Sequence, residues 1–64
     1  MPFVNIRLLA GRSPEVKREM ASRIVAAVAE TAKIDPAAVW VVFEDVAKED
    51  WLDGVSLGLS KPKG

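Results

Sequence analysis

Residues 3 to 9 alternate between two sides of an extended chain, and one of these sides is wholly apolar. The side chains of a β-strand point to opposite faces in turn, so a period of two residues is typical of a strand. The pattern predicts a strand over residues 3–9. Its core side would carry Val4, Ile6 and Leu8.

A helical pattern follows, and three residues mark its start. Ser13 suits the N-cap, Pro14 the first helical position and Glu15 the first turn. Because a residue before proline is pushed out of the α region, we expect the helix to end at Asp35 and Pro36. Its apolar face recurs at spacings of three and four residues, through Val16, Met20, Ile24, Ala27, Val28 and Thr31.

Residues 24–29 of this helix are apolar nearly all round. One interpretation is that the helix also contacts a partner, because packing on one sheet face needs only one apolar side. The other is that a core helix carries spare alanines for their helix propensity. The sequence leaves both interpretations open.

A second alternating segment occupies residues 39–46, after a short turn at 36–38. Val39, Val41 and Phe43 share one side of it, which predicts a second strand. A strand, a helix and another strand form a βαβ unit with parallel strands. We therefore expect one α/β (α+β) domain over residues 1–64.

The C-terminal part follows a polar loop at residues 47–50. Residues 55–59 alternate again and predict a short strand or hairpin, while residues 60–64 predict a loose basic end. Two strands and one helix cannot bury themselves, and a domain this small buries only about 60% of its unfolded surface. We expect self-association, with the C-terminal strand pairing with a neighbouring subunit.

The composition excludes several classes of protein. Nine basic residues balance nine acidic ones, which leaves no field to attract nucleic acid or an anionic membrane. Cysteine and histidine are absent, so disulfides and the usual zinc sites are excluded. No apolar run approaches about 20 residues, and no signal-peptide pattern opens the chain. We expect a cytoplasmic protein without a metal.

Pro2 is the candidate for chemistry. Initiator methionine is removed before a small residue, and loss of Met1 would leave the Pro2 ring nitrogen as a free secondary amine. An α-amino group titrates at about 7.7–8.0 in water, and an apolar pocket lowers this value toward neutrality, where general bases work best. The alternative is that Pro2 only begins an edge strand.

Four segments in order resemble the 4-oxalocrotonate tautomerase family. They are Met1–Ile6, Gly11–Glu15, Val39–Val42 and Trp51–Gly54, and the resemblance covers essentially the whole chain. It implies a βαβ subunit with a C-terminal hairpin, assembled as a homohexamer from three dimers. It also implies a keto–enol tautomerase without a cofactor, in which Pro2 moves a proton between oxygen and carbon.

The resemblance also implies substrate-binding residues. Arg12 matches the family arginine that holds the substrate carboxylate, although a solvated loop arginine is the simpler alternative. Trp51 falls where the family lines its pocket with an aromatic residue, and it could equally be a packing anchor. Trp40 replaces a second arginine, so we expect a monocarboxylate or less polar enol as substrate, such as phenylenolpyruvate or a 2-hydroxydienoate. Alternatively Arg7, which lies on the same strand side as Phe3 and Asn5, could contribute, but we assign it no role.

Other activities on the same scaffold stay open. Asp53 sits where related dehalogenases activate water, but Leu9 replaces an arginine that those enzymes carry, which disfavours a hydratase or dehalogenase. Decarboxylation by Pro2 has no distinguishing residue. A different class of function is a non-catalytic, oligomerising subunit that keeps the scaffold without the chemistry.

Overall fold

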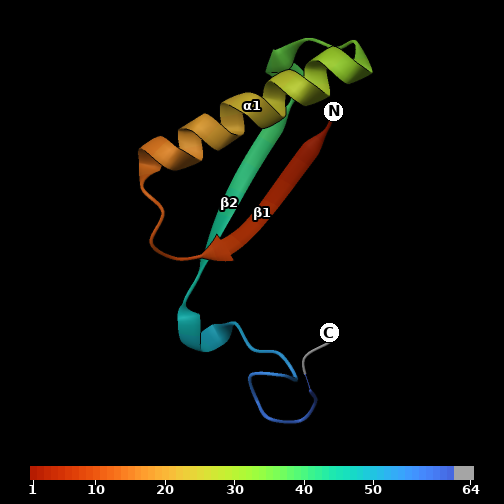
Figure 1. Ribbon diagram of the computed structural model, residues 1–64. Coiled ribbons are helices and arrows are strands. Elements are labelled where there is room, and N and C mark those ends of the chain that lie inside the picture. The colour runs from red at the N-terminus through yellow and green to blue at the C-terminus, as the bar shows by residue number, and fades with distance from the viewer. Residues whose placement is uncertain (62–64) are drawn as a thin grey trace.

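The computed structural model describes residues 1–61, so the last three residues of the predicted basic end lie outside the described residues. Strand β1 (Phe3–Leu9), helix α1 (Pro14–Ala32) and strand β2 (Trp40–Val46) form a βαβ unit. The two strands run parallel, with Phe3 opposite Trp40 and Leu9 opposite Val46. Helix α1 lies across one face of this sheet (Figure 1). The predicted fold class is confirmed.

The ends of α1 are set by local chemistry. Ser13 is the N-cap, and its Oγ accepts a hydrogen bond from the Val16 N–H at 3.2 Å. The helix ends at Ala32, before the predicted stop at Asp35, because Lys33 adopts a left-handed conformation with φ of 59°. The Lys33 N–H then donates to the Ala29 carbonyl, which closes the last turn.

The sheet face under α1 is the predicted one, since Val4, Ile6, Leu8, Val41 and Phe43 are all half-buried. On the helix, Met20, Ile24 and Val28 are half-buried as predicted, whereas Val16, Ala27 and Thr31 are exposed. The predicted stripe is therefore wrong at these three positions.

An ion pair explains part of this difference. Lys17, which the apolar pattern leaves out, lies on the inner side of α1 and donates from Nζ to Asp45 Oδ2 of β2 at 2.8 Å. The Lys17 side chain is only 24% exposed, so the ion pair ties the first turns of the helix to the end of the sheet. The side of α1 that packs on the sheet therefore includes Lys17, whereas its neighbour Val16 is exposed.

The core of the single chain is small. Within residues 1–61, Ala29 and Val39 are the buried apolar residues, and eleven large apolar side chains are exposed. Four of the eleven lie on the open face of the sheet, which α1 does not cover. They are Phe3, Leu9, Trp40 and Val42. A single copy of the chain therefore leaves much of its apolar surface exposed.

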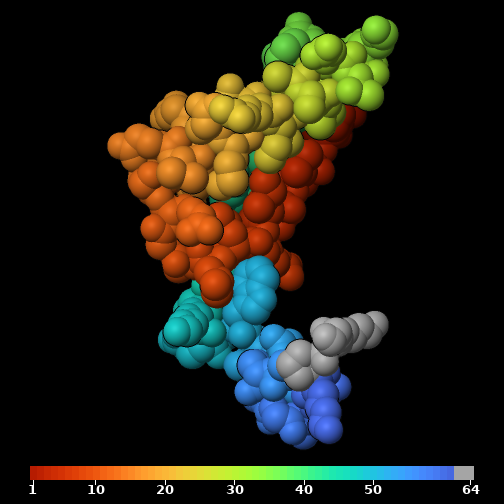
Figure 2. Space-filling model, in the orientation of Figure 1, coloured from red at the N-terminus to blue at the C-terminus, as the bar shows by residue number. Residues whose placement is uncertain are grey.

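The predicted strand over residues 55–59 is wrong for this structure. These residues form successive turns, with hydrogen bonds from the Leu57 N–H to the Asp53 carbonyl at 3.1 Å and from the Leu59 N–H to the Gly54 carbonyl at 2.8 Å. The segment stands away from the βαβ unit (Figure 2), so neither strand within residues 1–61 lies beside it to form a ladder. A strand pattern without a pairing partner closes its hydrogen bonds locally instead.

Among the helices within residues 1–61, none combines the length and the apolar composition that crossing a bilayer requires.

The left-handed Lys33 generates a stability prediction. Lys33→Gly should raise the free energy of unfolding by about 1 kcal/mol, because glycine adopts this conformation without the steric cost of a Cβ atom. Lys33→Ala is the matched control, since it removes the side chain but keeps the strain. Urea denaturation at one fixed protein concentration compares the three proteins. Equal midpoints for the glycine and alanine variants would contradict the strain.

Candidate active site

Pro2 is fixed at the N-terminal end of the sheet. It directly precedes β1, it is half-buried, and its carbonyl accepts a hydrogen bond from the Trp40 N–H at 3.0 Å. Met1 before it is 92% exposed, so an exposed residue caps the ring nitrogen of Pro2. Removal of Met1 would leave the Pro2 nitrogen as a free amine. The Pro2 carbonyl would still accept the hydrogen bond from Trp40 of β2.

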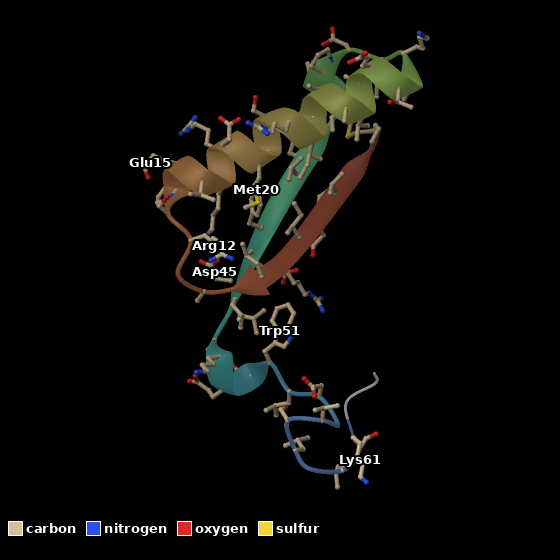
Figure 3. The ribbon with its side chains drawn as sticks, viewed as in Figure 1. Arg12, Glu15, Met20, Asp45, Trp51 and Lys61 are labelled. Carbon is tan, nitrogen blue, oxygen red and sulfur yellow. The ribbon has the colours of Figure 1, made fainter. Side chains whose placement is uncertain are left out.

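Arg12 and Trp51 lie at the other end of the sheet. Arg12 is in the loop after β1, and Trp51 follows a 3-10 turn, Lys48–Asp50, that comes after β2 (Figure 3). A strand of seven residues such as β1 spans about 20 Å at about 3.3 Å per residue. A single chain therefore brings Pro2 to Trp40, but it does not bring Pro2 to Arg12 or Trp51.

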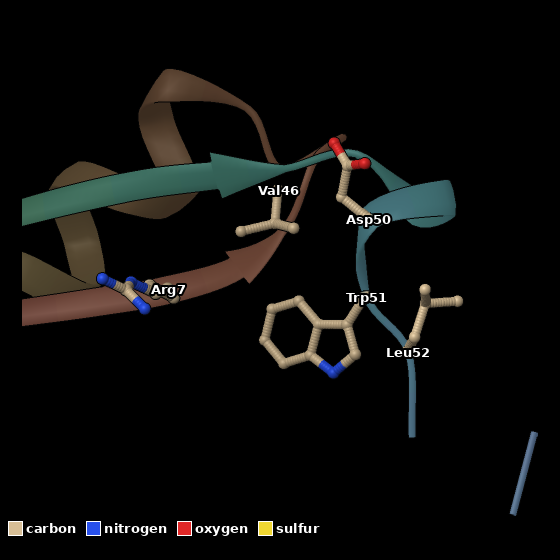
Figure 4. A pocket seen from close by; sticks show the side chains of 5 residues that line it. All are labelled: Arg7, Val46, Asp50, Trp51 and Leu52. Atoms are coloured by element: carbon tan, nitrogen blue, oxygen red, sulfur yellow. The ribbon is translucent and has the colours of Figure 1, made fainter. Parts of the chain in front are cut away.

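A hollow of about 280 Å³ lies at the Trp51 end, on the open side of the sheet. It is lined by Arg7, Val46, Asp50, Trp51 and Leu52 (Figure 4). Of these five residues, only Trp51 is a site residue predicted from the sequence. The strand alternation places Arg7 on the open face, but its neighbours in the hollow depend on how the chain turns after β2.

Arg7 belongs to a small polar group in the middle of the open face. It is opposite Glu44 in the strand register, and its Nε donates to Glu44 Oε1 at 3.3 Å. Hydrogen bonds from Asn5 and Arg7, together with the positive charge of Arg7, hold the pKa of the Glu44 carboxyl below its usual value. Both neighbours thus stabilise the ionised form of Glu44.

Asp53 has a local role in the C-terminal turns. Its Oδ1 accepts a hydrogen bond from the Ser56 N–H at 2.8 Å, and the Ser56 hydroxyl donates to the Asp53 carbonyl at 3.1 Å. The carboxylate thus caps a turn. Among residues 1–61, no three acidic side chains gather into a cluster that could hold a metal ion.

The chain matches known families along nearly its whole length. The family model described as "Tautomerase enzyme" matches residues 2–59. A probable tautomerase of Halalkalibacterium halodurans is 41% identical over 51 residues, which cover 80% of this chain and 84% of that protein. The 2-hydroxymuconate tautomerase of Comamonas testosteroni is 40% identical over 57 residues, which cover 88% and 90% of the two chains.

Solved structures agree with this match. A crystal structure of a 4-oxalocrotonate tautomerase homologue superposes with a TM-score of 0.81 at 30% identity, over the full length of both chains. Another homologue, from the tomaymycin biosynthetic pathway, gives a TM-score of 0.79 at 34% identity, over 83% of this chain and 82% of that one. The resemblance to 4-oxalocrotonate tautomerases is confirmed, and the chain belongs to the tautomerase family.

Proposed function

We propose that the chain is a keto–enol tautomerase acting on a 2-oxo acid, with the nitrogen of Pro2 as general base once Met1 is removed. The observation that carries the proposal is the family match, which begins at Pro2 and extends to residue 59. The placement of Pro2 supports it, because the bond from the Trp40 N–H to the Pro2 carbonyl fixes the residue whose nitrogen must react.

The proposed reaction moves one proton within the substrate. The Pro2 nitrogen accepts the proton of the enol hydroxyl, the oxygen becomes a carbonyl, and the electron pair of the C=C bond takes the proton back at carbon. No net proton, electron or co-reactant is required. One group can perform both transfers when its pKa lies near the working pH, and a secondary amine in an apolar site meets this condition.

The complete site is proposed to form between copies of the chain. Pro2 and Trp40 lie at one end of the sheet, whereas Arg12 and Trp51 lie at the other, so a second copy running in the opposite direction would bring the two sets together. The exposed apolar residues of the open sheet face and of the C-terminal turns supply the area for such contacts. We propose a homohexamer built from three dimers.

The substrate is proposed to be a small monocarboxylate enol. Arg12 would hold its carboxylate through the two parallel hydrogen bonds that a planar guanidinium offers. Trp40 and Trp51 would form apolar walls, and Trp40 supplies no charge for a second carboxylate. The relative from Comamonas testosteroni is a 2-hydroxymuconate tautomerase by name. The family resemblance implies an arginine in diacid tautomerases at the position where this chain has Trp40.

The first prediction concerns Pro2. Intact-mass spectrometry of the native protein should show loss of one methionine, and the protein should convert phenylenolpyruvate to its keto form. Pro2→Ala should lower kcat/KM about 100-fold, the lower range for loss of a general base. A retained Met1, or conversion that Pro2→Ala does not change, would leave the non-catalytic subunit as the better description.

The second prediction concerns Arg12. Arg12→Ala should raise KM and lower kcat/KM for a carboxylate substrate about tenfold, roughly the value of one charge-assisted hydrogen bond. The methyl ester of the same substrate should lose much less, because it offers no carboxylate. Arg18→Ala, an exposed arginine of α1, is the matched control. Equal losses on acid and ester would remove Arg12 from the binding role.

The third prediction concerns assembly. Sedimentation at micromolar concentration should give a mass near six times the 6.9 kDa of one chain. Val42→Glu, which places a charge on the open face, should reduce this mass, while Glu30→Lys on the exposed side of α1 should not. A folded monomer of the unchanged chain would contradict the proposed assembly.

A further inference from the structure

We propose that the hollow beside Trp51 binds a singly charged carboxylate through Arg7, and that Asp50 in the same hollow selects against a second carboxylate. This inference deepens the proposed function, and it rests on that function where it treats the carboxylate as a substrate. It assigns a specificity role to two residues outside the predicted site, Arg7 and Asp50.

Arg7 has hydrogen-bond donors to spare. A guanidinium carries five N–H groups, and within residues 1–61 that of Arg7 donates only from Nε, to Glu44 at 3.3 Å. That distance is long for a hydrogen bond between charged groups, and the Arg7 side chain is 70% exposed. The terminal nitrogens of Arg7 therefore have no acceptor among residues 1–61 and are available to the carboxylate of a ligand.

The apolar walls determine what kind of carboxylate fits. Figure 4 shows the six-membered ring of Trp51 turned toward Arg7, with Val46 close by and Leu52 on the far side of the indole. A volume of about 280 Å³ holds a small molecule only. The arrangement suits a carboxylate with a flat apolar or aromatic body, the carboxylate on Arg7 and the body against Trp51.

Asp50 gives the hollow a second, opposite charge. Its carboxylate lies on the side of the hollow away from Arg7 (Figure 4). A ligand with one carboxylate can place it on Arg7 and its uncharged end toward Asp50. A dicarboxylate that places one carboxylate on Arg7 and extends along the hollow brings its second charge nearer to Asp50, where like charges repel. The hollow would consequently prefer monocarboxylates to dicarboxylates, through attraction to Arg7 and repulsion from Asp50.

The place of the hollow agrees with the proposed assembly. It lies at the end of the sheet that carries Trp51 and the Arg12 loop, which is the end that Pro2 of a second copy would approach. Arg7 would then act beside Arg12 on the one carboxylate of the substrate and supply a positive charge that Trp40 cannot. The inference thus predicts a monocarboxylate preference from the hollow itself, independently of the residue at position 40.

Binding of probes that undergo no reaction tests the inference. The ¹⁵N-labelled full chain is titrated with benzoate, benzamide and isophthalate, and the indole N–H signal of Trp51, identified by its loss in Trp51→Phe, reports binding. Benzoate should shift this signal saturably. Arg7→Gln should weaken benzoate binding about tenfold and leave benzamide unchanged. Arg23→Gln, which also removes an exposed arginine paired to a glutamate, is the matched control.

Two further variants should tighten binding, an effect that misfolding of the protein would not produce. Glu44→Gln removes the carboxylate that competes for Arg7 and should tighten benzoate binding about threefold. Asp50→Asn should tighten isophthalate binding about threefold relative to benzoate. Unsaturable benzoate binding, or equal weakening by Arg7→Gln and Arg23→Gln, would overturn the inference.

The outcomes separate this inference from the proposed function. Benzoate has no enol, so its binding does not depend on Pro2 or on the removal of Met1. Arg7-dependent benzoate binding in a protein without tautomerase activity would support the hollow and contradict the chemistry. The reverse outcome can also be recognised. If Pro2→Ala abolishes tautomerase activity and Arg7→Gln leaves benzoate binding unchanged, the proposed function is supported and the carboxylate site at Arg7 is contradicted.

Discussion

Helix α1 can cover only one face of a two-stranded sheet, and the rest of the structure depends on this constraint. The covered face holds the alternating apolar residues of β1 and β2, and the ion pair between Lys17 and Asp45 fixes the helix over the end of the sheet. The open face keeps Phe3, Trp40 and Val42 exposed. Under the proposed assembly, a chain with so small a core would gain most of its remaining apolar burial from contact with other copies.

The same constraint shapes the proposed chemistry. Parallel strands place their starts at one end of the sheet and their ends at the other, so Pro2 and Trp51 are separated by the length of a strand. Association of copies would then serve two purposes, since it would cover the open face and bring a second set of side chains to each Pro2. Under this proposal, a variant that weakens the contact between copies also weakens the site.

Charge on the open face adds selectivity to this arrangement. Glu44 and Arg7 are cross-strand neighbours, and the hydrogen bonds and charge that lower the pKa of Glu44 stabilise its ionised form. The pair is weak because both side chains are well exposed. A weak pair leaves most of the Arg7 donors to the inferred carboxylate site, and the Glu44 carboxylate is only a weak competitor there.

The sequence by itself determined the local structure, because alternation, the Ser13 cap and the proline signals act over a few residues. It also identified the family, whose motifs are linear, and it predicted Pro2 as the reactive residue. Only the tertiary structure decided which stripe of α1 packs inward, since Lys17 had to meet Asp45 across the fold. The tertiary structure also decided that residues 55–59 form turns, because a strand exists only where another strand pairs with it. Finally, it placed Arg7 beside Trp51, through a turn after β2 that no periodic pattern encodes.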